Sequence, residues 1–349
     1  MEEKKNLAQM MRDRLNKRAG RKVTLETTKT EELVQVEGWI EMPEYFRRAT
    51  GAPGIPIGHI TQVIGKSDTG KTTLIMEVMV RVQKTGGVVF LIDSEHKFSF
   101  ERFRIMGGIA EDIVILPVES LEAAWNAWNL VCEDVEDLRK SNPDLPILAV
   151  WDSAAASIPD AILEAEAEDQ HVSVEARVNN KEIRKLRQKA RKYKIAMLII
   201  NHSYFSLPKF GVPEEIVKGG TESFYLSTLI LKTKRRAWLK RTIDGIDEKF
   251  GVHSLLEVFK GHLGGAKATT PFYIVPQGIL DGEDALKEYK DLIRDINGPE
   301  LNKFSLEDLR HAYISSPKKQ KTEEEKLKKS KNKKKIVNTE EESSDESED

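Results

Sequence analysis

The stretch VIGKSDTGKTT, residues 63–73, determines how the rest of the chain is interpreted. It contains G-x-x-x-x-G-K-T from Gly65 to Thr72, the Walker A pattern of a phosphate-binding loop. Gly65 and Gly70 permit backbone angles that a side chain would forbid, so successive N–H groups can turn toward one anion. Lys71 then supplies a positive charge for the β and γ phosphates, and the Thr72 hydroxyl is a ligand for Mg²⁺.

The segments beside the loop favour a genuine phosphate site over a chance match in a glycine-containing loop. Residues 60–64 form a short run with β-branched residues, typical of a strand, and apolar residues recur at helical spacing after the loop. A helix N-terminus behind the loop itself favours anions. We therefore expect ATP and Mg²⁺ here, with contacts from Gly65, Lys66, Ser67, Asp68, Thr69, Gly70, Lys71, Thr72 and Thr73.

The composition predicts a soluble cytoplasmic protein without a membrane partner. The 349 residues are 32% charged and 39% hydrophobic, and no apolar run approaches the roughly 20 residues of a membrane helix. The N-terminal sequence MEEKKNL lacks the apolar segment of a signal peptide. Cys132 is the only cysteine, which excludes an intrachain disulfide and a cysteine zinc cluster.

Four regions differ in composition and pattern. Residues 1–35 are polar and contain one short amphipathic helical pattern, which we expect to contact another subunit. Residues 36–280 are predicted to form the ATPase core, and residues 281–315 a small helical region. Residues 316–349 are first rich in lysine and then acidic, too polar to form a core, so a disordered tail is predicted.

Strand-like and helix-like segments alternate through the core, which predicts an α/β fold with a mostly parallel central sheet. Three apolar runs are typical of strands buried on both faces: Val88–Asp93, Ile147–Asp152 and Ala196–Asn201. Helical patterns cover Leu121–Leu138 and Glu175–Tyr193. Further strands, the later ones antiparallel, are predicted at Phe224–Thr233, Ser254–Lys260 and Pro271–Val275.

Polar residues follow three of these strands, at the sheet edge where ligands bind in such folds. Asp152 can help to hold Mg²⁺, with a turn or helix-cap aspartate as the alternative. Glu95 lies two residues beyond Val88–Asp93 and can accept a proton from an attacking water, although it also fits an ordinary polar loop. Asn201 and His202 either contact the γ phosphate or are an ordinary strand end.

Two loops are candidates for binding single-stranded nucleic acid. Residues 203–220 form a long segment, predicted to be irregular, whose aromatic residues and lysines suit base stacking and phosphate neutralisation; a lid over the nucleotide is the alternative. Residues 160–173 are acidic and would not attract DNA by charge. The helix that follows has a basic face, either simply solvated or binding phosphates, formed by Arg177, Lys181, Arg184 and Lys185.

Several motifs together carry a resemblance to a known family: GKSDTGKTT at 65–73, LIDSEH at 91–96, WDSAAA at 151–156, IINH at 199–202 and GGT at 219–221. In order and spacing they resemble the RecA recombinase family, including its phage UvsX-type members, from about Ile55 to Ile279. The resemblance implies a RecA-type P-loop ATPase core, in the cytoplasm of a bacterial or phage-infected cell.

The resemblance also implies roles for individual residues. Glu95 matches the catalytic glutamate and acts with Lys71, while Thr72 and Asp152 match the ligands of Mg²⁺. Further ATP contacts are implied for Arg102, Asp152, His202, Lys260 and His262, of which Lys260 would reach ATP across a subunit interface. Together with the loop chemistry, DNA contacts are expected from Val172, Arg177, Arg184, Tyr204, Leu207, Lys218, Gly219, Gly220 and Thr221.

The sequence departs from the family pattern at several positions. His202 replaces a glutamine, and His262 replaces a second interface lysine, which makes the charge there dependent on pH. Arg102 stands near the aromatic residue that stacks on adenine, where either its guanidinium or Phe103 can serve. The region after Ile279 is much shorter than the family's C-terminal domain, so capture of duplex DNA either passes to the lysine-rich tail or is absent.

The function implied by the resemblance is that of an ATP-dependent recombinase. It would assemble as a homo-oligomeric helical filament on single-stranded DNA, pair with homologous double-stranded DNA and exchange strands, with mediator and single-strand-binding proteins as further candidate partners. A ring helicase motor of the DnaB type and a non-catalytic ATP-binding mediator are the alternatives. The second alternative is disfavoured because Lys71, Glu95 and Asp152 are all present.

Overall fold

The structure, a computed structural model, is built on a nine-stranded sheet in the part of the chain that it describes. That part comprises residues 10–11, 14, 16–18, 36–163, 174–205, 215–218, 221–243, 245–263, 267–294, 296 and 298–314. The strand order is β13-β12-β11-β10-β3-β7-β6-β4-β5. The strands are β3 (Ile60–Ile64), β4 (Val88–Asp93), β5 (Ile113–Pro117), β6 (Ile147–Asp152), β7 (Ala196–Asn201), β10 (Leu229–Ile243), β11 (Ile246–Gly261), β12 (Thr270–Val275) and β13 (Gly278–Leu280).

The parallel strands are the part of the sheet that positions the site. β3 pairs with β7, β7 with β6, β6 with β4 and β4 with β5, all in parallel. The residues of β3 and β7 are buried throughout, as a sheet covered by helices on both faces requires. The predicted α/β class is confirmed, and the ranges predicted for β3, β4, β6 and β7 are confirmed to the residue.

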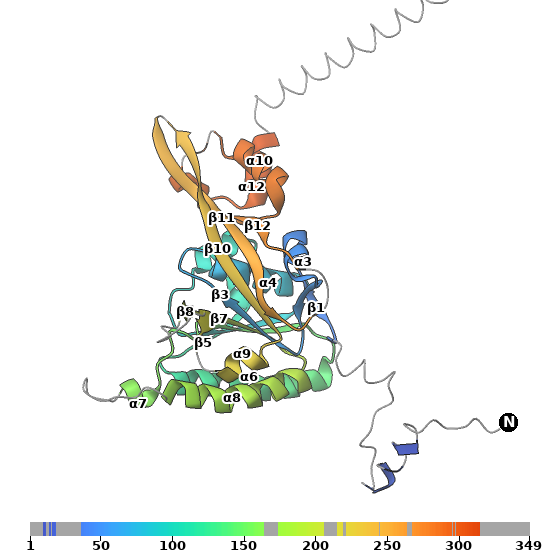
Figure 1. Ribbon diagram of the computed structural model, residues 1–349. Coiled ribbons are helices and arrows are strands. Elements are labelled where there is room, and N and C mark those ends of the chain that lie inside the picture. Colours follow the sequence, from blue (N-terminus) through green and yellow to red (C-terminus); the bar gives the residue numbers. More distant parts are fainter. Residues whose placement is uncertain are drawn as a thin grey trace, which may run out of the picture.

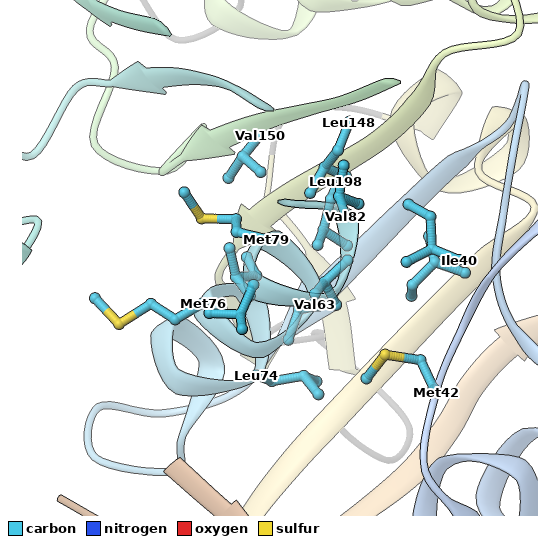
Figure 2. Packing of buried hydrophobic residues seen from close by; sticks show 14 of the residues in the cluster. Ile40, Met42, Val63, Leu74, Met76, Met79, Val82, Leu148, Val150 and Leu198 are labelled. Atoms are coloured by element: carbon cyan, nitrogen blue, oxygen red, sulfur yellow. The ribbon is translucent and has the colours of Figure 1, made fainter. Parts of the chain in front are cut away.

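Helices cover both faces of the parallel region (Figure 1). α4 (Lys71–Lys84) packs on one face, where Met79 and neighbouring apolar side chains meet Val63 of β3 (Figure 2). α6 (Leu121–Ser141) and α8 (Val174–Lys192) cover the other face in a second apolar cluster. The loops at the carboxyl ends of the strands therefore emerge from a core packed on both sides.

The antiparallel half of the sheet contains a long hairpin that rises away from the parallel strands (Figure 1). β10 runs beside β3 at its start and pairs with β11 along its whole length. Polar cross-strand contacts hold the outer half: Arg241 binds Glu248 at 2.7 Å, and Thr242 donates to Asp247 at 2.9 Å. The prediction Ser254–Lys260 is too short: β11 begins at Ile246, and the buried residues Phe250 and Val252 already alternate with less buried ones before Ser254.

The predicted strand Phe224–Thr233 is wrong in its first part. Residues Thr221–Leu226 form the helix α9, and β10 begins only at Leu229. Phe224 packs edge-on against Phe259, with ring centroids 6.2 Å apart, so aromatic residues that favour strands are used to hold a helix on the sheet. Tertiary packing overrides strand propensity here.

The segment 203–220, predicted to be irregular, is partly a hairpin. β8 (Ser203–Phe205) pairs antiparallel with β9 (Glu215–Val217). The remaining described elements are shorter connections and the C-terminal helices: β1 (Trp39–Glu41), α3 (Glu44–Thr50), β2 (Gly54–Pro56), α5 (Phe100–Ile105), η1 (Ala110–Asp112), α7 (Asp160–Leu163), α10 (Gly282–Leu292), α11 (Gly298–Leu301) and α12 (Leu306–Ile314).

Two predicted regions fall mostly or wholly outside the described residues. The helix predicted within 1–35 is represented only by separate helical positions at 10–11, 14 and 16–18. The charged tail predicted at 316–349 is not among the described residues. In the described part of the chain, none of the helices has both the length and the apolar character needed to span a membrane.

Candidate functional site

The phosphate loop joins β3 to α4 with the backbone geometry that its glycines predict. Gly65 and Gly70 have φ angles of 150° and 96°, and Asp68 between them has a φ of 57°. A side chain at Gly65 would place its Cβ 2.5 Å from the backbone carbonyl oxygen of Thr233, so both the conformation and the space exclude other residues there. The loop therefore presents its backbone at close range, as anion binding requires.

Strands β10 and β11 brace the loop from the antiparallel side. The hydroxyls of Thr69 and Thr233 lie 2.7 Å apart, and Ser254 Oγ donates to the Thr69 carbonyl at 3.0 Å. Asp68, at the tip of the loop, lies 3.8 Å from Arg235 of β10. These contacts fix the loop to the base of the hairpin as well as to the parallel strands.

Lys71 begins α4, and its ammonium folds back over the loop. Its Nζ donates to the carbonyl oxygens of Gly65 and Lys66, each at 2.9 Å. Burial lowers the pKa of Lys71, while the nearby carboxylates of Asp152 and Glu95 act to raise it. The lysine therefore lies between the loop and the acidic end of the sheet.

Asp152 ends β6 directly opposite a second carboxylate, Asp93 at the end of β4. Burial, together with the charges of Glu95 and Asp93, raises the pKa of Asp152 to about 7. Lys71 opposes this rise without cancelling it. A cation placed beside Asp152 would therefore relieve an unfavourable buried charge.

The donors in this region fit Mg²⁺ bound together with a nucleotide. Thr72 lies in the first turn of α4, whose N–H groups have no acceptors within the helix, and Asp152 lies at the same edge of the sheet. Mg²⁺ often uses one or two carboxylates together with phosphates and water. Among the described residues there is no group of three or more His, Cys, Asp or Glu side chains that could hold a metal by themselves.

Glu95 follows β4 and is held by two side chains. Ser153 Oγ donates to Glu95 Oε1 at 2.6 Å, and Lys97 Nζ lies 3.5 Å from Oε2. Burial acts to raise the pKa of Glu95, but these two partners outweigh it and the pKa is lowered. Asp93 shapes the turn by accepting the backbone N–H groups of Glu95 and His96 at 3.2 and 2.8 Å. Glu95 is thus ionised, the state that a proton acceptor needs.

The two polar residues at the end of β7 differ in their surroundings. Burial lowers the pKa of His202, and Lys71 acts in the same direction while Glu95 opposes it. His202 is therefore in the field of the phosphate loop and of the carboxylate. Asn201 is only 2% exposed, and its Nδ2 donates to Gln62 Oε1 at 3.0 Å. Its amide is hydrogen-bonded inside the protein, which favours the strand-end alternative over a phosphate contact for Asn201.

A cavity of about 500 Å³ opens beside the loop, a volume within the range of small-molecule sites. Its lining includes Gly70 and Thr73 of the phosphate-loop region together with Arg102 and Trp238. Arg102 Nη2 donates to the Val275 carbonyl at 3.3 Å, and burial lowers the pKa of this guanidinium. The cavity adjoins the phosphate loop and has room for the base and sugar of a nucleotide.

Phe103 does not reach this cavity, which corrects one of the two expectations for a stacking residue. It is fully buried in the core and packs against Phe98 at a ring distance of 5.6 Å. Trp238 was not predicted. It is 36% exposed, and the guanidinium of Arg235 lies 4.5 Å from its ring. The signal available in the sequence was a tryptophan inside the basic run KRRAWLK, residues 234–240.

Two predicted ATP ligands are not brought to the phosphate loop of their own chain. Lys260 Nζ instead donates to the carbonyls of Phe224, Tyr225 and Ser227 at the end of α9, at 2.6, 2.7 and 3.0 Å. His262 is exposed, and its backbone N–H donates to the carbonyl of Thr228 at 3.0 Å. Both lie next to α9, so an ATP contact from either requires another chain or a rearrangement.

Three of the predicted DNA-binding residues, Arg177, Arg184 and Tyr204, are exposed. Arg184 lies 2.8 Å from Glu222 of α9, so its charge is partly engaged. Thr221 begins α9.

Lys218 connects several segments around the start of α8. Its Nζ donates to the Ala155 carbonyl at 2.7 Å and lies 3.6 Å from Glu175. Four other predicted DNA-binding residues lie outside the described part of the chain: Val172, Leu207, Gly219 and Gly220. Lys218 and Thr221, which flank Gly219 and Gly220, lie beside α8 and at the start of α9.

Comparison with known proteins agrees with this arrangement. The family model described as the RecA N-terminal domain matches residues 5–283. A protein named RecA from Methylococcus capsulatus (strain ATCC 33009 / NCIMB 11132 / Bath) is 30% identical over 241 residues. The matched segment covers 69% of this chain and 64% of that relative, so the chain matches less than two thirds of the relative's length.

Proposed function

Because the chain belongs to the RecA family, we propose that it is an ATP-dependent DNA recombinase that forms a filament on single-stranded DNA. The filament would pair its strand with homologous double-stranded DNA and exchange strands in recombination and repair. The observation that carries the proposal is the convergence of Lys71, Glu95 and Asp152 at the phosphate loop, within a match that spans most of the chain.

The proposed hydrolysis assigns a separate task to each residue at this sheet edge. Backbone N–H groups of 65–73 and the ammonium of Lys71 bind phosphates, while Thr72 and Asp152 hold Mg²⁺, which would neutralise phosphate charge. Glu95 orients the attacking water through one carboxylate oxygen and accepts its proton. Ser153 and Lys97 keep that carboxylate ionised and directed toward the phosphates.

The proposed filament would account for the positions of two predicted ATP ligands that do not reach the phosphate loop of their own chain. Lys260 and His262 lie by α9 and not by the loop, so a neighbouring copy would present them to ATP. We assign DNA contact to the surface where segments near α8 and α9 converge. Its proposed contacts are Val172, Arg177, Arg184, Tyr204, Leu207, Lys218, Gly219, Gly220 and Thr221. Mediator and single-strand-binding proteins remain proposed partners in the cytoplasm.

Three-strand exchange tests the proposal directly. Purified protein is incubated with circular single-stranded DNA, a homologous linear duplex, Mg²⁺ and ATP, and joint molecules are followed on a gel. We expect product only with ATP, and none from Lys71→Ala, which loses the phosphate-binding charge. Strand exchange that continues without ATP, or a fully active Lys71→Ala variant, would refute the site. Closed hexamers that unwind duplex without exchanging strands would support a ring helicase instead.

A further inference from the structure

Gln62 is a fully buried amide in β3, three residues before the phosphate loop. Its Oε1 accepts from Asn201 Nδ2 at 3.0 Å. Its Nε2, which carries two hydrogens, has three acceptors: the carbonyl and hydroxyl oxygens of Ser223, both at 2.9 Å, and Ser227 Oγ at 2.7 Å, so one hydrogen is shared between two of them. A buried amide is unfavourable unless it is hydrogen-bonded, and these partners occupy both ends of this one.

One end of this network lies at the nucleotide side of the sheet. In the parallel pairing of β7 with β3, Asn201 lies opposite Ile64, two residues beyond Gln62. The side chains of Asn201 and Gln62 are therefore diagonal neighbours on one face of the sheet. Asn201 Oδ1 accepts the backbone N–H of His202 at 2.8 Å, and its Nδ2 also donates to the Lys218 carbonyl at 2.8 Å. Asn201 thus links Gln62 to the residue in the field of the phosphate loop and to a candidate DNA contact.

The other end of the network is α9. Ser227 Oγ donates back to the Ser223 carbonyl at 2.8 Å, and the Ser227 carbonyl accepts from Lys260. Glu222, in the first turn of the same helix, binds Arg184. A displacement of α9 would therefore change the surroundings of a candidate DNA-binding cation and of a candidate interface cation together.

We propose that Gln62 is a positioning residue that transmits the nucleotide state of the phosphate loop to α9. The inference rests on the proposed function and adds a route for its coupling. When the end of β7 shifts with the nucleotide, the Asn201 amide moves, and Gln62 carries the shift to Ser223 and Ser227. The packed sheet around it is stiff, so the buried bonds either move together or break.

The matched pair of variants is Gln62→Met and Thr61→Val. Methionine has nearly the length of glutamine but lacks the amide. Thr61 is the preceding residue, is equally buried, and its hydroxyl has no hydrogen-bond partner in the described part of the chain. Valine at this position changes buried polarity in β3 without touching the network. Because Thr61→Val breaks no hydrogen bond in the described part of the chain, thermal unfolding of both variants is measured as well, and coupling is compared at a temperature at which each variant is fully folded.

The experiment measures binding of a fluorescein-labelled oligo(dT) with and without ATPγS, and ATP hydrolysis with and without poly(dT). For Gln62→Met we expect basal turnover and the KM for ATP within about twofold of wild type. We expect the tightening of oligo(dT) binding by ATPγS to fall at least about fivefold, within the usual range of coupling between sites. The tightening of ATPγS binding by oligo(dT) must fall by the same factor.

The outcomes separate this inference from the proposed function. Wild-type coupling in Gln62→Met, or equal losses in both variants, would overturn the inference alone. A wild-type chain that shows no effect of nucleotide on oligo(dT) binding would overturn the proposed function, and the inference with it. If Gln62→Met does not fold, Ser227→Ala removes one acceptor of the Gln62 amide, and retained coupling in that variant would also overturn the inference.

Discussion

Replacing Asp152 by asparagine should stabilise the metal-free protein while weakening its binding of Mg²⁺ and ATP. The carboxylate is buried beside Glu95 and Asp93, and this environment raises its pKa from 3.8 to about 7. Such a change corresponds to roughly 4 kcal/mol at about 1.4 kcal/mol per tenfold change in proton affinity, an upper value for this coupled site. Asparagine has nearly the same shape and carries no charge.

The sign of the effect depends on pH. Because the pKa of Asp152 is higher in the folded state than in the unfolded state, ionisation opposes folding. That penalty is absent below the unfolded pKa of 3.8, grows as the pH rises, and is complete above about 7. The stability advantage of Asp152→Asn should therefore be roughly 1–2 kcal/mol at pH 5 and up to about 4 kcal/mol at pH 8.

The assay is urea or thermal unfolding in EDTA at pH 5 and pH 8, with the variant compared with wild type at each pH. Asp112→Asn, an exposed aspartate in η1, is the control and should change little at either pH. Adding Mg²⁺ and ATP should stabilise the wild type strongly and the variant weakly, because only the wild type has the Asp152 carboxylate as a ligand for the ion. An Asp152→Asn variant that is no more stable than wild type at pH 8 would refute the reasoning.

Three further predictions follow from the contacts at the site. Glu95→Gln should lower ATP turnover by about 10²–10⁴ and retain ATP-dependent DNA binding, which nitrocellulose filter binding would detect; normal turnover would exclude the proton-acceptor role. Arg102→Ala should raise the KM for ATP about tenfold and leave inhibition by tripolyphosphate unchanged, because Arg102 lines the cavity proposed for the base and is not part of the phosphate loop. Glu222→Gln should tighten nucleotide-free binding of oligo(dT) roughly two- to fivefold by releasing Arg184, with Glu300→Gln, whose partner is Lys303 in the C-terminal helices, as control.

Most of the parallel part of the fold could be predicted because β4, β6 and β7 are continuous apolar runs and β3 leads directly into the phosphate loop, whereas the edge strand β5 was missed. β4, β6 and β7 are buried on both faces, so each ends at its first polar residue, as Asp152 shows. The same logic placed Glu95 and Asp152 at one edge. Nothing in the sequence indicated how closely Ser153 would bind Glu95, since that contact depends on the approach of two separate strand ends.

The errors lie where tertiary contacts replace local preference. The aromatic run at Phe224 resembles a strand, but the helix there is held by Lys260, which is distant in sequence. Phe103 and Arg102 are adjacent, and only packing decides that the phenyl ring enters the core while the guanidinium reaches the cavity. Gln62 could have been recognised as unusual, because a lone amide in a buried strand requires partners.

The contacts of α9 bear on how DNA and a neighbouring nucleotide would influence each other. If phosphates of DNA attract Arg184 and ATP of a neighbouring chain attracts Lys260, both ligands must first remove contacts made to the same short helix. The Arg184–Glu222 pair is exposed and contributes little to holding α9. The bonds from the Lys260 ammonium to backbone carbonyls are charge-assisted and stronger. Whichever ligand releases α9 first lowers the free energy that the second must supply, which is positive coupling without contact between the ligands. Since the Lys260 bonds hold α9 more strongly than the Arg184–Glu222 pair does, assembly with a neighbouring chain should promote DNA binding more than the Arg184 contact alone can.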